Sequence, residues 1–257
     1  MLRLPTLASA MVSEKSWSIE AVARLFLGVI LTLCGGMFLA GLLEKVKLGL
    51  KPDQIQYAQM VVLIAFFQGA ALIWIAVFLR QSNLSWRSAF GLRPASRARV
   101  VAAGLVVGLL VLPFVWLLQW MSEDAMEWLH LKVVAQAAVT ELQSSALSVP
   151  QKALFGVFTI LLAPAAEEAL FRGILYPTIK QAGHPRWALW ATSVVFAILH
   201  FNMASFVSLV FLAVVLTFLY EASDSLLAPI ATHGMFNAAN FFYLLFGDSL
   251  GKWLHLP

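Results

Sequence analysis

The sequence predicts an all-α fold: a polytopic bundle of about seven transmembrane helices, with an eighth as an alternative. Of the 257 residues, 61% are hydrophobic and only 12% are charged. The mean hydropathy of +0.85 is far above that of an ordinary soluble domain. Apolar runs long enough to cross a bilayer recur along the chain. Backbone in lipid must satisfy its own hydrogen bonds, which favours helices.

The N-terminal part, residues 1–150, holds three expected spans and an amphipathic segment. The first two spans run over residues 21–43 and 57–79, and Gln68 in the second is expected to form an interhelical hydrogen bond. The third span, residues 100–121, has Gly104 and Gly108 at a spacing that allows close helix packing.

The end of this part, residues 122–150, is acidic, with apolar residues at helical spacing from Met126 to Ala137. This pattern predicts an amphipathic helix at the surface, and the eighth span arises if the segment inserts instead.

The C-terminal part, residues 151–257, holds four further spans and is expected to be the catalytic helical core of one integrated membrane domain. The fourth span begins near Lys152, and the short fifth span, residues 187–201, ends beside His200. The sixth span covers residues 203–220. The seventh, residues 226–246, contains His233 and Asn237.

The placement of charges predicts the topology. The link from Arg80 to Arg99 holds five arginines and no acid, which places it in the cytoplasm by the positive-inside rule. The N-terminus is then cytoplasmic too. The net charge of +4 is spread along the chain and gives no signal for nucleic-acid binding. The single Cys34 excludes an intrachain disulfide and a cysteine metal site.

The stretch APAAEEALFRGILYP, residues 163–177, places Glu167, Glu168 and Arg172 in apolar sequence. Ionisable residues inside a membrane are costly and mark functional sites. Glu168 and Arg172 lie four residues apart, so they share a helix face and can pair. Glu167 points about 100° away and is free to face a cavity, beside a bend expected at Pro164.

The last three spans add three polar residues. His200 stands at the end of the fifth span, and His233 and Asn237 lie one turn apart on the seventh. A carboxylate, two imidazoles and an amide suit amide hydrolysis, because the carboxylate can activate water and the donors can stabilise an oxyanion. The same set would also suit a zinc ion held by Glu167, His200 and His233, with one open position for water.

Three motifs together resemble the signature of the CPBP intramembrane protease family, the CAAX prenyl endopeptidase type II and bacteriocin-processing group. They are Glu167-Glu168-x-x-x-Arg172, Phe196-x-x-x-His200 and His233-x-x-x-Asn237, within residues 154–246.

The resemblance implies that Glu167 activates water with help from His200, and that His233 and Asn237 hold the oxyanion. It assigns supporting roles to Glu168, Arg172 and Phe196, and Asn202 is a further candidate contact. The family has been described both as metal-dependent and as glutamic-type. Asn237 favours the metal-free mechanism, because an amide is an uncommon zinc ligand, and no cofactor other than zinc is considered.

The function expected is hydrolysis of a peptide bond in a membrane-anchored protein or peptide, with the enzyme in a bacterial plasma membrane. The alternative is a non-catalytic membrane scaffold or bacteriocin-immunity partner that uses the polar cluster structurally. A proton-coupled transporter is a third class, without the repeated broken helices typical of such proteins. The substrate's identity and the oligomeric state are left open.

Overall fold

The computed structural model describes residues 15, 17–46, 49, 51–92, 96–143 and 147–253. This part of the chain contains helices and no strand, which confirms the all-α class. The α-helices and the π-turns labelled η are, in order, α1 (Ile19–Lys45), α2 (Pro52–Ile64), η2 (Ala65–Gly69), α3 (Ala70–Gln81), α4 (Trp86–Ala89), α5 (Arg97–Trp128), α6 (Ala137–Gln143), α7 (Val149–Val157), η3 (Phe158–Leu162), α8 (Ala163–Leu170), η4 (Phe171–Leu175), α9 (Tyr176–Gln181), α10 (Pro185–Ile198), α11 (Phe206–Ser223) and α12 (Leu227–Trp253).

Several helices follow one another without a break, so seven long helical stretches correspond to the seven expected spans. Five are long and apolar enough to cross a membrane by themselves: Ile19–Lys45, Gln54–Gln81, Arg97–Trp128, Val149–Gln181 and Phe206–Ser223. The other two are α10, which has 14 residues, and α12, which carries several polar side chains. The chain is an integral membrane protein.

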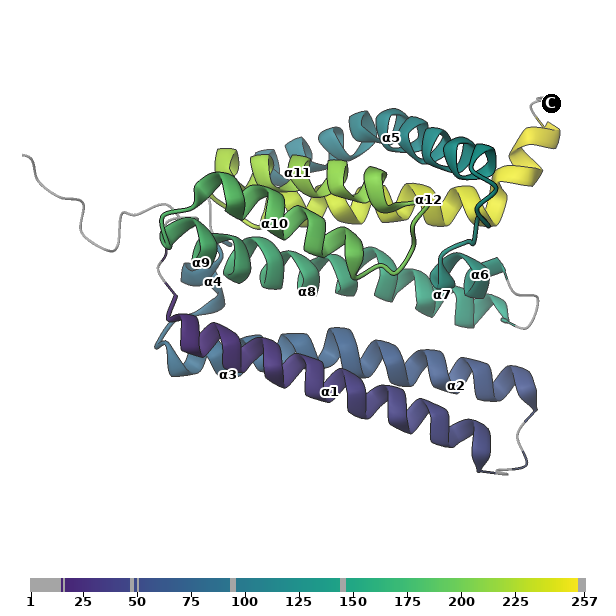
Figure 1. The fold of residues 1–257 in the computed structure, drawn as a ribbon, viewed down its shortest axis with the longest axis horizontal. Coiled ribbons are helices and arrows are strands. Elements are labelled where there is room, and N and C mark those ends of the chain that lie inside the picture. Colours follow the sequence, from purple (N-terminus) through teal and green to yellow (C-terminus); the bar gives the residue numbers. More distant parts are fainter. Residues whose placement is uncertain are drawn as a thin grey trace, which may run out of the picture.

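The helices are arranged in layers (Figure 1). One layer contains α1 and the continuous stretch from α2 to α3, and the opposite side of the molecule contains α5, α11 and α12. The stretch from α7 to α9 lies between them, with α10 beside it. The charged sequence around Glu167 is therefore in the middle of the bundle.

Two glycines bring α5 and α12 together, as the small-residue spacing predicted. A Cβ added to Gly104 would lie 2.5 Å from the carbonyl oxygen of Ala228. One added to Gly108 would lie 2.8 Å from the Cβ of Met235. Thr232 of α12 also donates a hydrogen bond to the carbonyl oxygen of Gly104, at 2.8 Å. This contact fixes the helix that carries His233.

The expected amphipathic helix between Met126 and Ala137 is wrong. Helix α5 continues past its apolar part to Trp128, the chain is not helical over residues 129–136, and α6 has only seven residues. His130 has a φ of 56°, a left-handed conformation that a helix cannot continue through. No eighth span is present in the described residues between 122 and 150.

Candidate active site

Helix α8 carries Glu167 and Glu168 and lies between two π-turns, η3 and η4, the second of which carries Arg172. In η3 the N–H of Ala163 bonds the carbonyl of Phe158, five residues back. Pro164 comes next and has no N–H to give to Thr159. Asn237 of α12 supplies the missing donor, because its Nδ2 donates to the Thr159 carbonyl oxygen at 2.8 Å. The hydrogen bond from Asn237 therefore connects α12 to η3, at the position where the proline leaves a carbonyl without its helical donor.

Glu168 and Arg172 form the ion pair expected from their spacing. Arg172 Nη1 donates to Glu168 Oε1 at 2.9 Å, and both side chains are almost completely buried. The guanidinium also donates to the carbonyl oxygen of Ala213 and contacts Thr217, both on α11. A buried charge needs such partners, because an unpaired one is very costly.

His233 connects the two glutamates. Its Nδ1–H donates to Glu168 Oε1 at 2.9 Å, so one carboxylate oxygen receives both His233 and Arg172. The Nε2 of His233 lies 3.9 Å from Glu167 Oε2, too long for a hydrogen bond. Glu167 is 12% exposed, and its Oε2 is buried without a hydrogen-bond partner. Two side chains thus bond one oxygen of Glu168, whose Oε2 is likewise buried without a partner. Glu167, in contrast, makes no hydrogen bond to any residue that the structure describes.

The ring of Phe196 joins the three motifs. Its centroid lies 4.8 Å from that of His200 and 5.7 Å from that of His233. The Arg172 guanidinium sits over the same ring, 4.8 Å from its centroid. Phe171 packs against it edge-on. Residues from η4, from the end of α10 and from α12 therefore meet around one aromatic side chain.

His200 lies just beyond the end of α10. Its Nδ1–H donates to the carbonyl oxygen of Phe196 at 2.7 Å, which fixes the ring orientation. In the neutral imidazole this leaves Nε2 as the proton acceptor. His200 is therefore oriented to accept a proton.

Asn202 makes its hydrogen bonds elsewhere. Its Nδ2 donates to the Val134 carbonyl oxygen at 2.7 Å, and its Oδ1 accepts from the backbone N–H of Ser205 at 3.0 Å. These bonds fasten the start of α11 to the segment between α5 and α6. None of the hydrogen bonds found within the described residues joins Asn202 to Glu167, His200 or His233.

The alternative zinc set, Glu167, His200 and His233, is not gathered into a metal site. Among the residues that the structure describes, no three His, Cys, Asp or Glu side chains are arranged to hold a metal ion. Within this set the close approach is the one between Glu167 and His233.

Gln68 is a residue whose surroundings the sequence did not predict. It lies in η2, in the middle of the second span, where an interhelical hydrogen bond was expected. Its Oε1 is buried and has no hydrogen-bond partner. A buried amide oxygen without a donor is uncommon.

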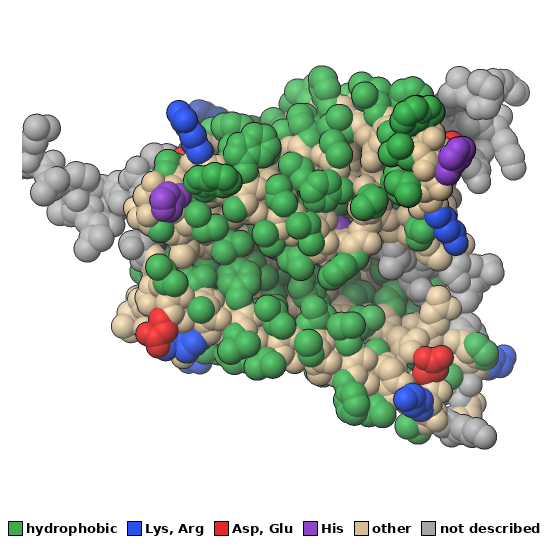
Figure 2. Space-filling view, in the orientation of Figure 1, with side chains coloured by type: hydrophobic (Ala, Val, Ile, Leu, Met, Phe, Trp, Pro, Cys, Tyr) green, Lys and Arg blue, Asp and Glu red, His purple; other side chains and the backbone are tan. Residues whose placement is uncertain are grey.

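Charged and hydrophobic side chains occupy different parts of the molecular surface. In Figure 2 the charged side chains lie near the two ends of the long axis and hydrophobic ones cover the band between. The surface is hollowed between the layer of α1 to α3 and the layers above it, and a histidine is visible at the edge of this hollow (Figure 2).

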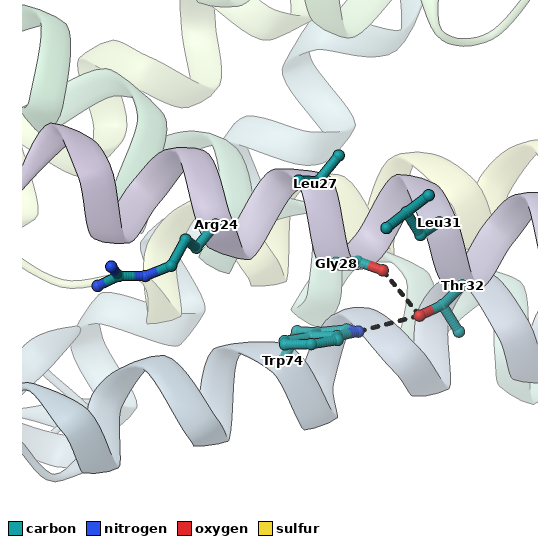
Figure 3. A pocket seen from close by; sticks show the side chains of 6 residues that line it. All are labelled: Arg24, Leu27, Gly28, Leu31, Thr32 and Trp74. Carbon is teal, nitrogen blue, oxygen red and sulfur yellow. Dashed lines mark hydrogen bonds between the residues drawn. The ribbon is translucent and has the colours of Figure 1, made fainter.

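A groove of about 450 Å³ lies away from these residues, between α1 and α3. Its walls include Leu27, Leu31 and the flat face of Trp74, with Arg24 at one end (Figure 3). The indole N–H donates to Thr32, whose hydroxyl donates to the Gly28 carbonyl oxygen (Figure 3). No carboxylate or imidazole lines this groove, so it lacks the groups needed for hydrolysis.

Comparison with known proteins identifies part of the chain. Residues 149–239 match the family described as type II CAAX prenyl endopeptidase, Rce1-like. An uncharacterised protein of Bacillus subtilis (strain 168), YpbD, is 34% identical over 86 residues, which are 32% of this chain and 41% of that protein. The chain thus covers about two fifths of that relative's length. No solved structure matches the chain.

The matched segment contains Glu167, His200, His233 and Asn237. The match confirms the family that the three motifs resemble. The description of this family is that of a CAAX-type endopeptidase.

Proposed function

We propose that this chain, whose residues 149–239 belong to the Rce1-like type II CAAX prenyl endopeptidase family, is an intramembrane endopeptidase with Glu167 as its general base. The observation that carries the proposal is the contrast between two adjacent carboxylates. Glu168 is hydrogen-bonded by Arg172 and His233, whereas Glu167 makes no hydrogen bond to a described residue and only approaches His233, at 3.9 Å. A carboxylate kept free of strong partners is suited to take a proton from water.

The proposed reaction begins when Glu167 removes a proton from a water molecule, which attacks the carbonyl carbon of the scissile peptide bond. The oxyanion that forms receives one hydrogen bond from the second N–H of Asn237, since the first is used by Thr159. In the proposed mechanism His233 is doubly protonated, so that its Nδ1–H donates to Glu168 while its Nε2–H donates to the oxyanion. The proton then passes to the leaving amine, with His200 assisting through its Nε2. Phe196 keeps both imidazoles in place, and Glu168 with Arg172 holds His233.

We propose a membrane-anchored protein or peptide as the substrate and a bacterial plasma membrane as the location. The family description supports a prenylated C-terminal peptide as the probe, and the bacterial relative supports the location. Asn202 is proposed only as a structural contact, on the basis of its hydrogen bonds to Val134 and Ser205.

The test is cleavage of an internally quenched, prenylated CaaX peptide by the purified protein in liposomes. Glu167→Gln keeps the size of the side chain but removes the base, so kcat should fall by about 10²-fold or more. Glu20→Gln is the matched control, because Glu20 lies exposed on α1. Wild-type activity in the Glu167→Gln variant would overturn the assignment of the base.

We also propose that the reaction needs no metal. Its support is that the Asn237 amide is a better oxyanion donor than zinc ligand. Treatment with 1,10-phenanthroline followed by gel filtration should leave kcat unchanged. A loss of activity that is restored by added zinc would contradict the glutamic-type mechanism.

A further inference from the structure

An apolar cluster closes the bundle next to the polar site. It is formed by the buried side chains of Leu142, Phe155 and Phe241, and Met60, Ile64 and Ile160 pack against it. Three long helical stretches contribute to this cluster: the stretch from α2 to α3, the stretch from α7 to α9, which we call the site helix, and α12. Because these residues contact one another, they mark one position along the length of the bundle. The positions of other residues on the three stretches can be counted from it in helical turns.

Each helix presents a polar residue within two turns of this level. Gln68 lies four residues after Ile64, and Asn237 lies four residues before Phe241. Glu167 lies two turns after Ile160, beyond η3. The second span and the site helix run in the same direction and α12 runs opposite (Figure 1), so these three steps all lead the same way along the bundle.

The direction of Gln68 follows from its neighbours in η2. Phe66 packs so closely against Gly36 of α1 that a Cβ added to Gly36 would clash with the Phe66 Cβ. Successive residues on a helix differ by about 100°, so Gln68 points to nearly the opposite side from α1. Helix α8 contacts both η2 and the following helix, α3. Gln68 thus points away from α1, from a turn that lies beside α8.

Gln68 Oε1 and Glu167 Oε2 are both buried, and neither has a hydrogen-bond partner. Two acceptors cannot bond one another, so each needs a donor. A water molecule has two O–H donors and can satisfy both at once, as buried waters do in other proteins. Its lone pairs are then left for the substrate.

We infer that Gln68 binds the attacking water together with Glu167, and so belongs to the active site. This inference rests on the proposed function. The water donates one hydrogen to Gln68 Oε1 and the other to Glu167 Oε2. When its oxygen forms the bond to the peptide carbonyl carbon, the second hydrogen passes to Glu167 as a proton, and Gln68 keeps its hydrogen bond.

The test replaces Gln68 by Met, which has a similar shape but no strong acceptor. With the prenylated CaaX peptide, Gln68→Met should lower kcat by about tenfold to a hundredfold and leave KM nearly unchanged. Gln59→Leu is the matched control on the same helix, because Gln59 donates to the Ala40 carbonyl oxygen on α1 and is outside the site. A shorter acceptor, Gln68→Asn, should retain more activity than Gln68→Met.

A second measurement does not depend on cleavage. Infrared spectra in ordinary and heavy-oxygen water identify bands of bound water by their isotope shift. A band that disappears in both Gln68→Met and Glu167→Gln, but remains in Gln59→Leu, supports a shared water even if the wild-type protein cleaves no peptide.

The outcomes separate the two proposals. Full kcat in Gln68→Met, in a wild type that cleaves, overturns the role of Gln68 and leaves the endopeptidase intact. A water band unaffected by either substitution overturns the shared water. If Gln68→Met does not accumulate in membranes, Gln68→Leu is used in both measurements with the same expectations.

Discussion

Two prolines flank the charged stretch, and each leaves a backbone carbonyl that a side chain from another element satisfies. Pro164 removes the donor for Thr159, and Asn237 replaces it at 2.8 Å. Pro177 likewise has no N–H for the preceding turn, where the Gly173 carbonyl oxygen accepts from the Trp17 indole at 3.1 Å. At each proline a helical hydrogen bond is missing, and the carbonyl oxygen accepts a hydrogen bond from a distant side chain instead. These two contacts position the stretch from α7 to α9.

The buried pair of Glu168 and Arg172 yields a prediction about stability. Arg172→Met leaves the Glu168 carboxylate buried with His233 alone, which should lower the free energy of unfolding by about 3–5 kcal/mol. The double variant Glu168→Gln with Arg172→Met removes both charges and should lose clearly less. Unfolding by sodium dodecyl sulfate titration of the purified protein measures the difference.

The chain offers a matched exposed pair for this experiment. Glu20 and Arg24 have the same spacing and order, but their side chains are 78% and 61% exposed. Arg24→Met should therefore change the free energy of unfolding by no more than about 1 kcal/mol. Equal losses in Arg172→Met and Arg24→Met would contradict the claim that burial makes the inner pair important.

Spacing along one helix was enough to predict the Glu168 and Arg172 pair. It could not predict that His233, 65 residues after Glu168, shares the same carboxylate oxygen. It also could not show that Asn202 bonds to Val134, because that contact depends on how a loop folds over a helix end. Contacts within a helix follow from its period, whereas contacts between helices depend on packing.

Among the features of the helices, the π-turns most directly affect the directions of the side chains at the site. Each adds one residue to a turn, so side chains beyond it are rotated relative to an unbroken α-helix. Two of them, η3 and η4, enclose the eight residues of α8, and η2 lies opposite in the second span. Hydropathy predicted the span that contains each turn but not the turn itself, because a π-turn leaves the apolar composition unchanged.

The close contact of α5 and α12 gives a prediction about helix packing. Gly104→Ala places a Cβ 2.5 Å from the Ala228 carbonyl oxygen, so the helices must separate, at a cost of about 1–3 kcal/mol. Since α12 carries His233, cleavage activity should fall with stability. Thermal unfolding and the CaaX peptide assay measure the two effects.

Gly35→Ala is the control for this substitution. Gly35 lies within α1, and an added Cβ would meet nothing within 4 Å. Alanine is the better helix former, so neither stability nor activity should decrease. A loss at Gly35 equal to that at Gly104 would show that the effect does not come from the contact with α12.

Across the whole molecule, charge is divided between two ends separated by an apolar band (Figure 2). Ser225 donates to the Gly91 carbonyl oxygen and Leu226 to that of Phe90, which brings the arginine-containing link and the turn before α12 to one end. The acidic residues at the end of α5 and the segment leading to α6 lie at the other end (Figure 1). The sequence predicted this division from the distribution of arginines, without the contacts that hold the turns together.

We propose that the end with the arginines faces the cytoplasm. Two exposed glutamines at helix ends provide the test: Gln81 at the end of α3 and Gln143 at the end of α6, near opposite ends of the bundle (Figure 1). Each is replaced by Cys in a Cys34→Ser background, because Cys34 is the single native cysteine. In intact bacterial spheroplasts, a membrane-impermeant maleimide should label Gln143→Cys, whereas Gln81→Cys should react only after the membrane is opened. The opposite labelling would place the arginines outside, against the positive-inside rule, and would reverse the side from which a substrate approaches the site.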